Sequence, residues 1–352
     1  MTYHNRLMPW AMMIIGLGGV GCSSNGIPPA ADRGTADSRG LSDGRPDGHP
    51  VPADGSVNPN PCQCTADQVC DSQGQCITPQ PQTGDVVGEL TLLHQVAPLD
   101  STILGKLAKA SARFFDSQAL PPDNRTVYPT PDGKRCAYEI GTVYPEDWPS
   151  PPFLDAGKTL TFTVAGAPGP IEITSLDVPT TGTAYFHDDV PPHYTEGSSS
   201  YPDFFDPVYL PAGAKFQVAA SGGKNVGAQT FSGGELPALF TITAPAVESA
   251  VVGVPSGQDL TITWSPAQPS ATMEIFIASD DGMGNIMLLS CSGMDDGSLT
   301  VPAEAMKNYF GTVGLQLRRT VVRYTKAATV DGKVLHLYLT GRHARLGSFK
   351  LE

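Results

Sequence analysis

The chain has 352 residues and a formal net charge of −13, with 22 Lys and Arg against 35 Asp and Glu. Such an acidic balance argues against a nucleic-acid partner, because nucleic-acid-binding proteins need a basic surface to neutralise phosphates. High glycine and proline content (38 and 33 residues) with few charged residues is typical of an exported, β-rich protein.

The first 21 residues have the organisation of an export signal. A basic start containing Arg6 precedes the apolar run 7–20, which is shorter than the roughly 20 residues that span a bilayer. The letters GLGGVG (16–21) also match the dinucleotide-binding pattern G-x-G-x-x-G. That turn requires a following helix, and the next residues contain two prolines and no apolar period. We therefore predict a signal peptide over residues 1–21.

The signal leads through small residues to a cysteine, in the sequence GLGGVGCSS. This stretch resembles the lipobox of bacterial lipoproteins, with Gly19 at a position where the family usually has leucine. The resemblance implies that Cys22 becomes a lipid-bearing N-terminus, with outer-membrane lipid as its partner. Because Ser23 is not aspartate, it implies sorting to the outer membrane, on the periplasmic or the surface face. The alternative is an ordinary signal cut nearby, which would release a soluble protein.

Two small segments are predicted between the anchor and the main fold. Residues 22–60 hold too few large apolar side chains to offset the entropy of ordering, so we predict a disordered tether. Residues 61–80 contain four cysteines, which favour a disulfide-stapled module in an oxidising compartment over a zinc site. Three pairings are possible, and we favour the one that avoids a strained bridge between the first two cysteines. The pairs are then Cys62–Cys70 and Cys64–Cys76.

Alternating apolar residues over 85–244 predict a first antiparallel β-sandwich. The pattern is seen in KTLTFTV, IEIT, KFQVA and FTIT, which are separated by turn-forming clusters. One exception is DSTILGKLAKA, where Asp100 would cap a short helix that buries Ile103, Leu104 and Leu107.

Residues 245–352 predict a second β-sandwich. Strands are indicated by QDLTITW, TMEIFIA, IMLLSC, VGLQL and VLHLYLT, and VPAEAMKNYF indicates one helical turn that starts at Pro302. About seven strands with an early tryptophan resemble an immunoglobulin or fibronectin type III fold. The partner cysteines of a true immunoglobulin pair are absent, because this segment has only Cys291. Cys136 and Cys291 would be either buried free thiols, which we favour, or a bridge between the two domains.

The overall layout is similar to that of uncharacterised envelope lipoproteins of myxobacterial-type Gram-negative bacteria. The similarity covers the tether, a domain with one cysteine-bearing strand, and the stretch LTITW…LLSCSGMDDGSLTVPAEAM. The resemblance implies the architecture and the location described above. It implies no activity.

A long polar and aromatic stretch, YFHDDVPPHYTEGSSSYPDFFDPVY, is the first candidate site. Its imidazoles and carboxylates would suit a metal ion, and its aromatic rings would stack on a sugar. A surface loop pinned by its aromatics is the simpler interpretation. The candidate ligand residues are His187, Asp188, Asp189, His193, Tyr194, Glu196, Tyr201, Phe204 and Phe205.

A basic C-terminal region is the second candidate. Residues 305–352 contain nine Lys and Arg against two acidic residues. Their arginines would form a face for polyanions such as lipopolysaccharide phosphates, unless strand alternation scatters them and they pair with the chain's own carboxylates. The scattered arrangement is favoured. The arginines are Arg318, Arg319, Arg323, Arg342 and Arg345.

Taken together, the sequence predicts a non-catalytic, lipid-anchored envelope protein that displays two β-sandwiches for an unknown protein or glycan partner, with no cofactor. Serine-hydrolase and zinc-protease signatures are missing from it. The alternatives are a metal-dependent hydrolase that uses the 187–196 loop and a purely structural envelope spacer.

Overall fold

The protein is nearly all-β, as the alternating patterns predict. The computed structural model describes residues 69–71, 76–77, 81–82, 84–98, 104–117, 126–129, 134–142, 153–178, 182–187, 210–248, 251–280 and 285–352. Within these ranges the regular structure is β-strand apart from one short α-helix. The predicted signal, Cys22 and the predicted tether lie outside the described residues.

The strands fall into two sheets. Among the described residues, sixteen strands form the larger sheet, whose main path is β11-β10-β7-β8-β9-β4-β3-β19-β18-β15-β16-β6-β5. The smaller sheet has the order β12-β14-β17. The elements are β1 (Val69–Asp71), β2 (Cys76–Ile77), β3 (Val86–Pro98), β4 (Leu104–Asp116), β5 (Thr126–Pro129), β6 (Arg135–Thr142), β7 (Thr159–Val164), β8 (Ile171–Val178), β9 (Gly182–His187), β10 (Lys215–Ala220), β11 (Gln229–Glu235), β12 (Thr241–Ala244), β13 (Val252–Val254), β14 (Leu260–Ser265), β15 (Thr272–Asp280), β16 (Asn285–Met294), β17 (Ser298–Val301), α2 (Ala303–Met306), β18 (Gly311–Ala328) and β19 (Val334–Leu351).

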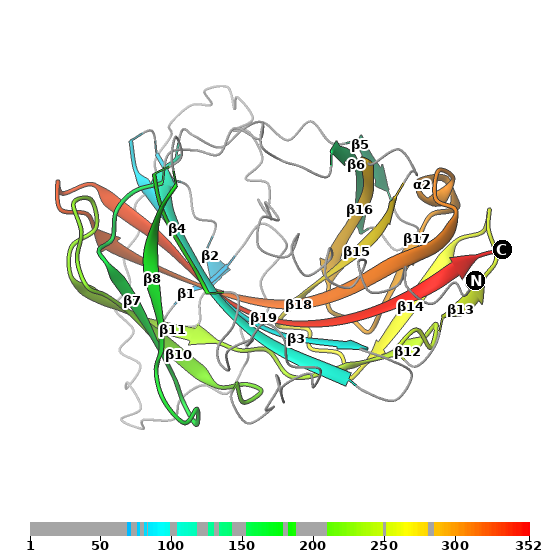
Figure 1. Cartoon of the computed structure of the whole chain (residues 1–352), viewed down its shortest axis with the longest axis horizontal. Coiled ribbons are helices and arrows are strands. Elements are labelled where there is room, and N and C mark those ends of the chain that lie inside the picture. The colour runs from blue at the N-terminus through cyan, green and yellow to red at the C-terminus, as the bar shows by residue number, and fades with distance from the viewer. Residues whose placement is uncertain are drawn as a thin grey trace, which may run out of the picture.

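The hairpin of β18 and β19 forms the floor of the molecule. Its two 18-residue strands run along most of the long axis and curve upward at both ends, and β3 lies beside β19 (Figure 1). Strands β7, β8, β10 and β11 stand at one end, and β15, β16 and α2 stand at the other (Figure 1). The larger sheet is therefore a trough with a concave upper face and a convex underside.

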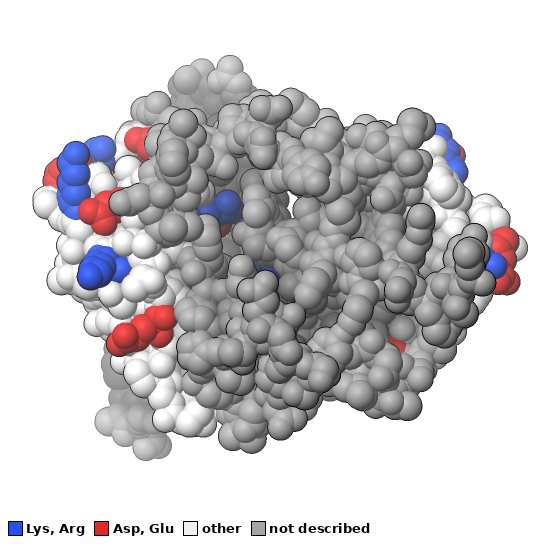
Figure 2. Space-filling view, viewed as in Figure 1, with Lys and Arg blue, Asp and Glu red and all other residues white. Residues whose placement is uncertain are grey.

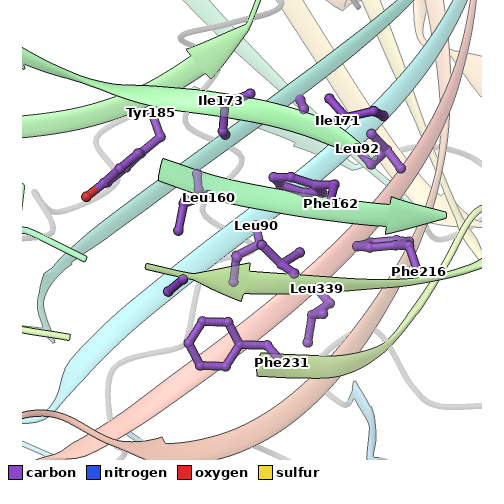
Figure 3. Close-up of a cluster of buried hydrophobic side chains, with 14 of the residues drawn as sticks. Leu90, Leu92, Leu160, Phe162, Ile171, Ile173, Tyr185, Phe216, Phe231 and Leu339 are labelled. Carbon is purple, nitrogen blue, oxygen red and sulfur yellow. The ribbon is translucent and has the colours of Figure 1, made fainter. Parts of the chain in front are cut away.

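Two apolar cores lie on the underside of the floor. Residues paired across a sheet share a face, so the register assigns the odd-numbered residues of β18 and β19 to this side. The first core joins Leu90 and Leu339 of the floor to aromatic residues of β7, β10 and β11, as Figure 3 shows for Phe162, Phe216 and Phe231. Burial of alternate residues in β7 confirms the pattern predicted for KTLTFTV.

The second core is enclosed by the smaller sheet. Trp264 and Ile262 of β14 pack with Ile275 of β15 and Leu317 of β18, all of which are buried. Helix α2 begins directly after Pro302, which confirms the helical turn predicted there. Its buried Met306 closes one end of this core.

One close approach depends on a glycine. Gly341 lies in the middle of β19, and a Cβ atom built there would come within 1.9 Å of the Glu235 carbonyl oxygen at the end of β11. Any larger residue would therefore push β11 away from the floor. The small residue allows the first core to close against the hairpin.

The helix predicted over 100–110 is wrong. Residues 104–116 form strand β4, which pairs along its whole length with β3. The alternate residues Ala108, Ala110, Ala112 and Phe114 all join the first core, so period-two burial decides the structure. The three-residue spacing of Leu104 and Leu107 is incidental to it.

Strand pairs also cross the boundary predicted between residues 244 and 245. Strand β3 pairs in parallel with β19, and β6 pairs antiparallel with β16. The second pairing places Cys136 opposite Cys291, and the two form a disulfide. The prediction of two free thiols is therefore wrong, and Cys136 and Cys291 form the bridge that was its alternative.

Candidate functional site

The floor hairpin carries all five arginines of the predicted polyanion face, and strand alternation divides them between its two faces. Arg318 and Arg319 are adjacent in β18, so their side chains point to opposite sides. The underside receives Arg319, Arg323 and Arg345, and the concave face receives Arg318 and Arg342. The five therefore do not form one face.

Arg319 is held in a fully buried ion pair on the underside. Its Nε donates to Oδ2 of Asp295, and both side chains have no exposed area. Its guanidinium also donates to the Ala238 carbonyl at 3.0 Å and lies 4.8 Å from the ring centre of Phe240. The other oxygen of Asp295 accepts the indole N–H of Trp264 at 2.5 Å. This network joins both sheets and leaves Arg319 no role on the surface.

The other two underside arginines also pair with carboxylates of the chain. NH2 of Arg323 donates to Oε2 of Glu235 at 2.6 Å, which ties β11 to the floor. NH2 of Arg345 donates to Oε2 of Glu248 at 3.0 Å, which ties down the segment after β12. For these residues, pairing with the chain's own acids is what the structure shows.

Arg318 lies on the concave face with few polar partners. Its NH2 donates to Oε1 of Gln316 at 3.1 Å, and its guanidinium lies 4.5 Å from the ring centre of Phe276. The nearest carboxylate is Glu274, at 4.0 Å from NH1. Burial, and then the neighbouring Arg342, lowers the pKa of Arg318 to about 10, against the opposing effect of Glu274. Arg318 is therefore charged at neutral pH.

Polar side chains surround Arg318 in the middle of the concave face. Gln95 of β3 lies on the same face across the hairpin, and Nε2 of Gln316 donates to its Oε1 at 3.4 Å. Thr320 donates to Oε2 of Glu274 at 3.3 Å. Figure 2 shows only a few basic atoms near the middle of the molecule in this view. The buried polar residues of this face include Gln95, Lys109, Glu274, Gln316, Arg318, Thr320 and Thr340.

The predicted aromatic and acidic loop falls almost wholly outside the described residues. His187 is the last residue of β9, where its backbone pairs with Ala110 of β4. The remaining eight residues of that candidate site are not described. In the part of the chain that is described, no three His, Cys, Asp or Glu side chains gather as they would around a metal ion.

The cysteine module is described only in part. Strands β1 and β2 pair so that Cys70 lies opposite Cys76, and β1 continues in parallel beside β18. Cys76 is disulfide-bonded. Cys62 and Cys64 lie outside the described residues, so the predicted pairing stays a prediction.

A hydrogen-bonded chain of Tyr324, His336 and Asp85 was missed by sequence reasoning. The tyrosine hydroxyl lies 2.7 Å from Nδ1 of His336, and Nε2 of the same ring lies 2.9 Å from Oδ2 of Asp85. Such an order resembles a nucleophile, base and orienting acid. Burial, however, raises the pKa of Tyr324 to about 12, which is the opposite of activation. The chain instead fixes the start of β3 to the floor.

A second missed feature lies on the underside between the two cores. The rings of His94 and His343 are 5.1 Å apart, and both side chains are buried. Burial lowers the pKa of His343 well below its usual value, and His94, Arg345 and Arg319 add to the effect. Only the register between β3 and β19 brings these histidines together, and it cannot be read from either strand alone.

Comparison with known proteins leaves the function to be argued from this geometry. No protein-family model matches the chain, and no curated protein matches it. Among the described helices, none is both long and apolar enough to cross a membrane.

Proposed function

We propose that the chain is a non-catalytic, lipid-anchored protein of the bacterial outer membrane that binds a glycan or protein partner in its trough. The location rests on the export signal and the lipobox-like stretch that ends at Cys22. After lipid attachment, the tether of residues 22–60 would hold the β-rich body away from the membrane.

The binding role rests on one observation, which is the polarity of the buried concave face. Buried amides and charged groups cost free energy unless they find hydrogen-bond partners. Here Gln95, Gln316 and Arg318 occupy the middle of a sheet whose opposite face carries the apolar cores. Polar groups gathered on one face of a sheet are suited to a polar ligand, because a glycan or peptide can supply the missing partners.

The immunoglobulin-like interpretation of residues 245–352 is part of the same proposal. The smaller sheet covers the underside of β15, β16 and β18 around Trp264, which supports a two-layer arrangement with the tryptophan inside. Domains of this type commonly display binding surfaces on loops or sheet faces.

Two experiments test the proposal. Labelling cells with an alkyne fatty acid should mark the wild-type protein and leave Cys22→Ala unlabelled, with Cys76→Ala as a labelled control. When solubilised envelope glycans are incubated with the purified full chain, the protein should retain a defined fraction of the glycans. Labelling of Cys22→Ala would overturn the anchor, and failure to retain glycan or a defined envelope protein would overturn the binding role.

A further inference from the structure

The two guanidinium groups on the concave face are less fully paired than those of the other three arginines, because Arg318 has one long ion pair with Glu274 and no hydrogen bond to a carboxylate. Arg342 is the cross-strand partner of Thr320, so it lies diagonally across the hairpin from Arg318. Within the described part of the chain, Arg342 forms no ion pair, and its buried Nε has no hydrogen-bond partner. Nε and NH1 of Arg318 are likewise buried without a hydrogen bond.

Like charges close together on one buried face are unfavourable without an anion between them. Among the described residues, the carboxylate that pairs with Arg318 is Glu274, which stands at the limit of ion-pair distance and also accepts from Thr320. Lys109 is a third buried cation on this face and has an interaction of its own. The positive charge of this face is therefore only partly compensated by the described residues.

The donor geometry suits an oxyanion. Guanidinium groups bind carboxylate and phosphate through charge-assisted N–H donors, and Nε and NH1 of Arg318 are both buried without a hydrogen bond. Nε2 of Gln95 is buried without a partner on the same face and provides a further neutral donor. The ring of Phe276 packs against the guanidinium at 4.5 Å and restricts its orientation before a ligand binds.

We propose that Arg318 and Arg342, together with Gln95, bind the carboxylate or phosphate group of an acidic sugar. The inference that the anion is carried by a sugar rests on the proposed function of glycan binding. The inference of an anion site rests only on the unpaired donors. A uronic acid and a phosphorylated sugar are the two sources of this chemistry, and the test separates them.

The experiment is calorimetric titration of the full chain, purified in detergent, with inorganic phosphate and D-galacturonate, and with D-galactose as the neutral match. We expect saturable binding of one or both anions and none of galactose. Arg318→Met and Arg342→Met should each weaken binding about tenfold or more, as expected for loss of a charge-assisted hydrogen bond. Arg323→Met removes an arginine from the opposite face and should change the affinity less than about twofold.

Each outcome decides a separate point. Binding of galacturonate alone assigns a uronic acid, and binding of phosphate alone assigns a phosphorylated sugar. Unsaturable uptake means an adventitious ion only, and this result, or equal binding by folded Arg318→Met and Arg342→Met, overturns the site. If Arg318→Met fails to fold, Arg318→Lys and Gln95→Leu replace it and should also weaken binding.

The two proposals fail in different ways. Anion binding without retention of envelope glycan would leave the site standing and overturn the glycan partner. Retention of neutral glycan that is unchanged in Arg342→Met would support the proposed function and overturn the anion site.

Discussion

Replacing Asp295 by asparagine tests whether the buried ion pair with Arg319 holds the two sheets together. The change conserves shape and removes the only carboxylate that contacts Arg319 in the described structure. A buried charge left without its counter-charge costs about 3–5 kcal/mol. The carbonyls of Ala238 and Pro266 still accept from the guanidinium, which places this cost near the lower limit.

The indole of Trp264 adds a second contribution. Its N–H donates to a carboxylate in the wild type and would donate to a neutral amide in the variant, a loss of about 1 kcal/mol. The expected total is about 4 kcal/mol, which is a large share of the roughly 5–15 kcal/mol by which folded proteins are stable. Urea unfolding followed by circular dichroism measures it.

Two further variants make this prediction decisive. The double variant Asp295→Leu/Arg319→Met removes both charges and should recover at least half of the loss, because no charge remains buried and unpaired. Glu304→Gln breaks an exposed ion pair with Lys307 and should cost less than about 1 kcal/mol. A loss below about 1 kcal/mol for Asp295→Asn would show that the pair is not what joins the sheets.

Three other predictions concern the disulfide and the buried titratable groups. The double variant Cys136→Ala/Cys291→Ala should lose about 2–5 kcal/mol of unfolding free energy in urea, because the bridge closes a loop of 155 residues. Equal stability of the wild type with and without reductant would contradict this. Burial raises the pKa of Tyr324 from 10 to about 12, so its contribution to stability is complete below pH 10 and is lost as the pH rises to 12. Tyr324→Phe should flatten the fall in unfolding free energy over that range, and an unchanged slope would argue against it. Because the pKa of His343 is lowered in the folded state, the unfolded chain takes up a proton on this residue at a higher pH than the folded chain does. The unfolding free energy should therefore fall as the pH drops below about 6.5, and it should fall less in His343→Phe.

The strands could be predicted from the sequence because most of them bury one face only. Period-two alternation in KTLTFTV and LTITW follows directly from that burial, and both segments are strands in the structure. The alternation fails to predict β4 because alanines supply most of its buried face, at Ala108, Ala110 and Ala112. Alanine suits helices as well as strands, so the larger leucines dominated the sequence pattern.

The candidate site was predictable only in part. Alternation alone says that Arg318 and Arg319 must point to opposite faces. It does not say which of them meets an acid, because Asp295 is 24 residues from Arg319, and Glu235 is 88 residues from Arg323. Long-range register decides those pairs, and it also decides the bridge between Cys136 and Cys291.

The buried polar groups in the middle of the underside follow from the way in which two separate cores divide this face of the hairpin. At about 3.3 Å per residue, each 18-residue strand extends roughly 60 Å, which is longer than a single small core can cover. One core covers Leu335–Leu339 of β19 and the other covers Val313–Leu317 of β18. Between them the underside of the floor has no continuous apolar layer, and there Arg319 and His343 lie, whereas Arg318 and Arg342 lie on the opposite, concave face. Because β3 depends on β19 and β16 depends on β6, neither 85–244 nor 245–352 can complete its sheet without the other. The concave face that carries Arg318 and Arg342 is therefore a product of the whole chain, and so is any ligand site on it.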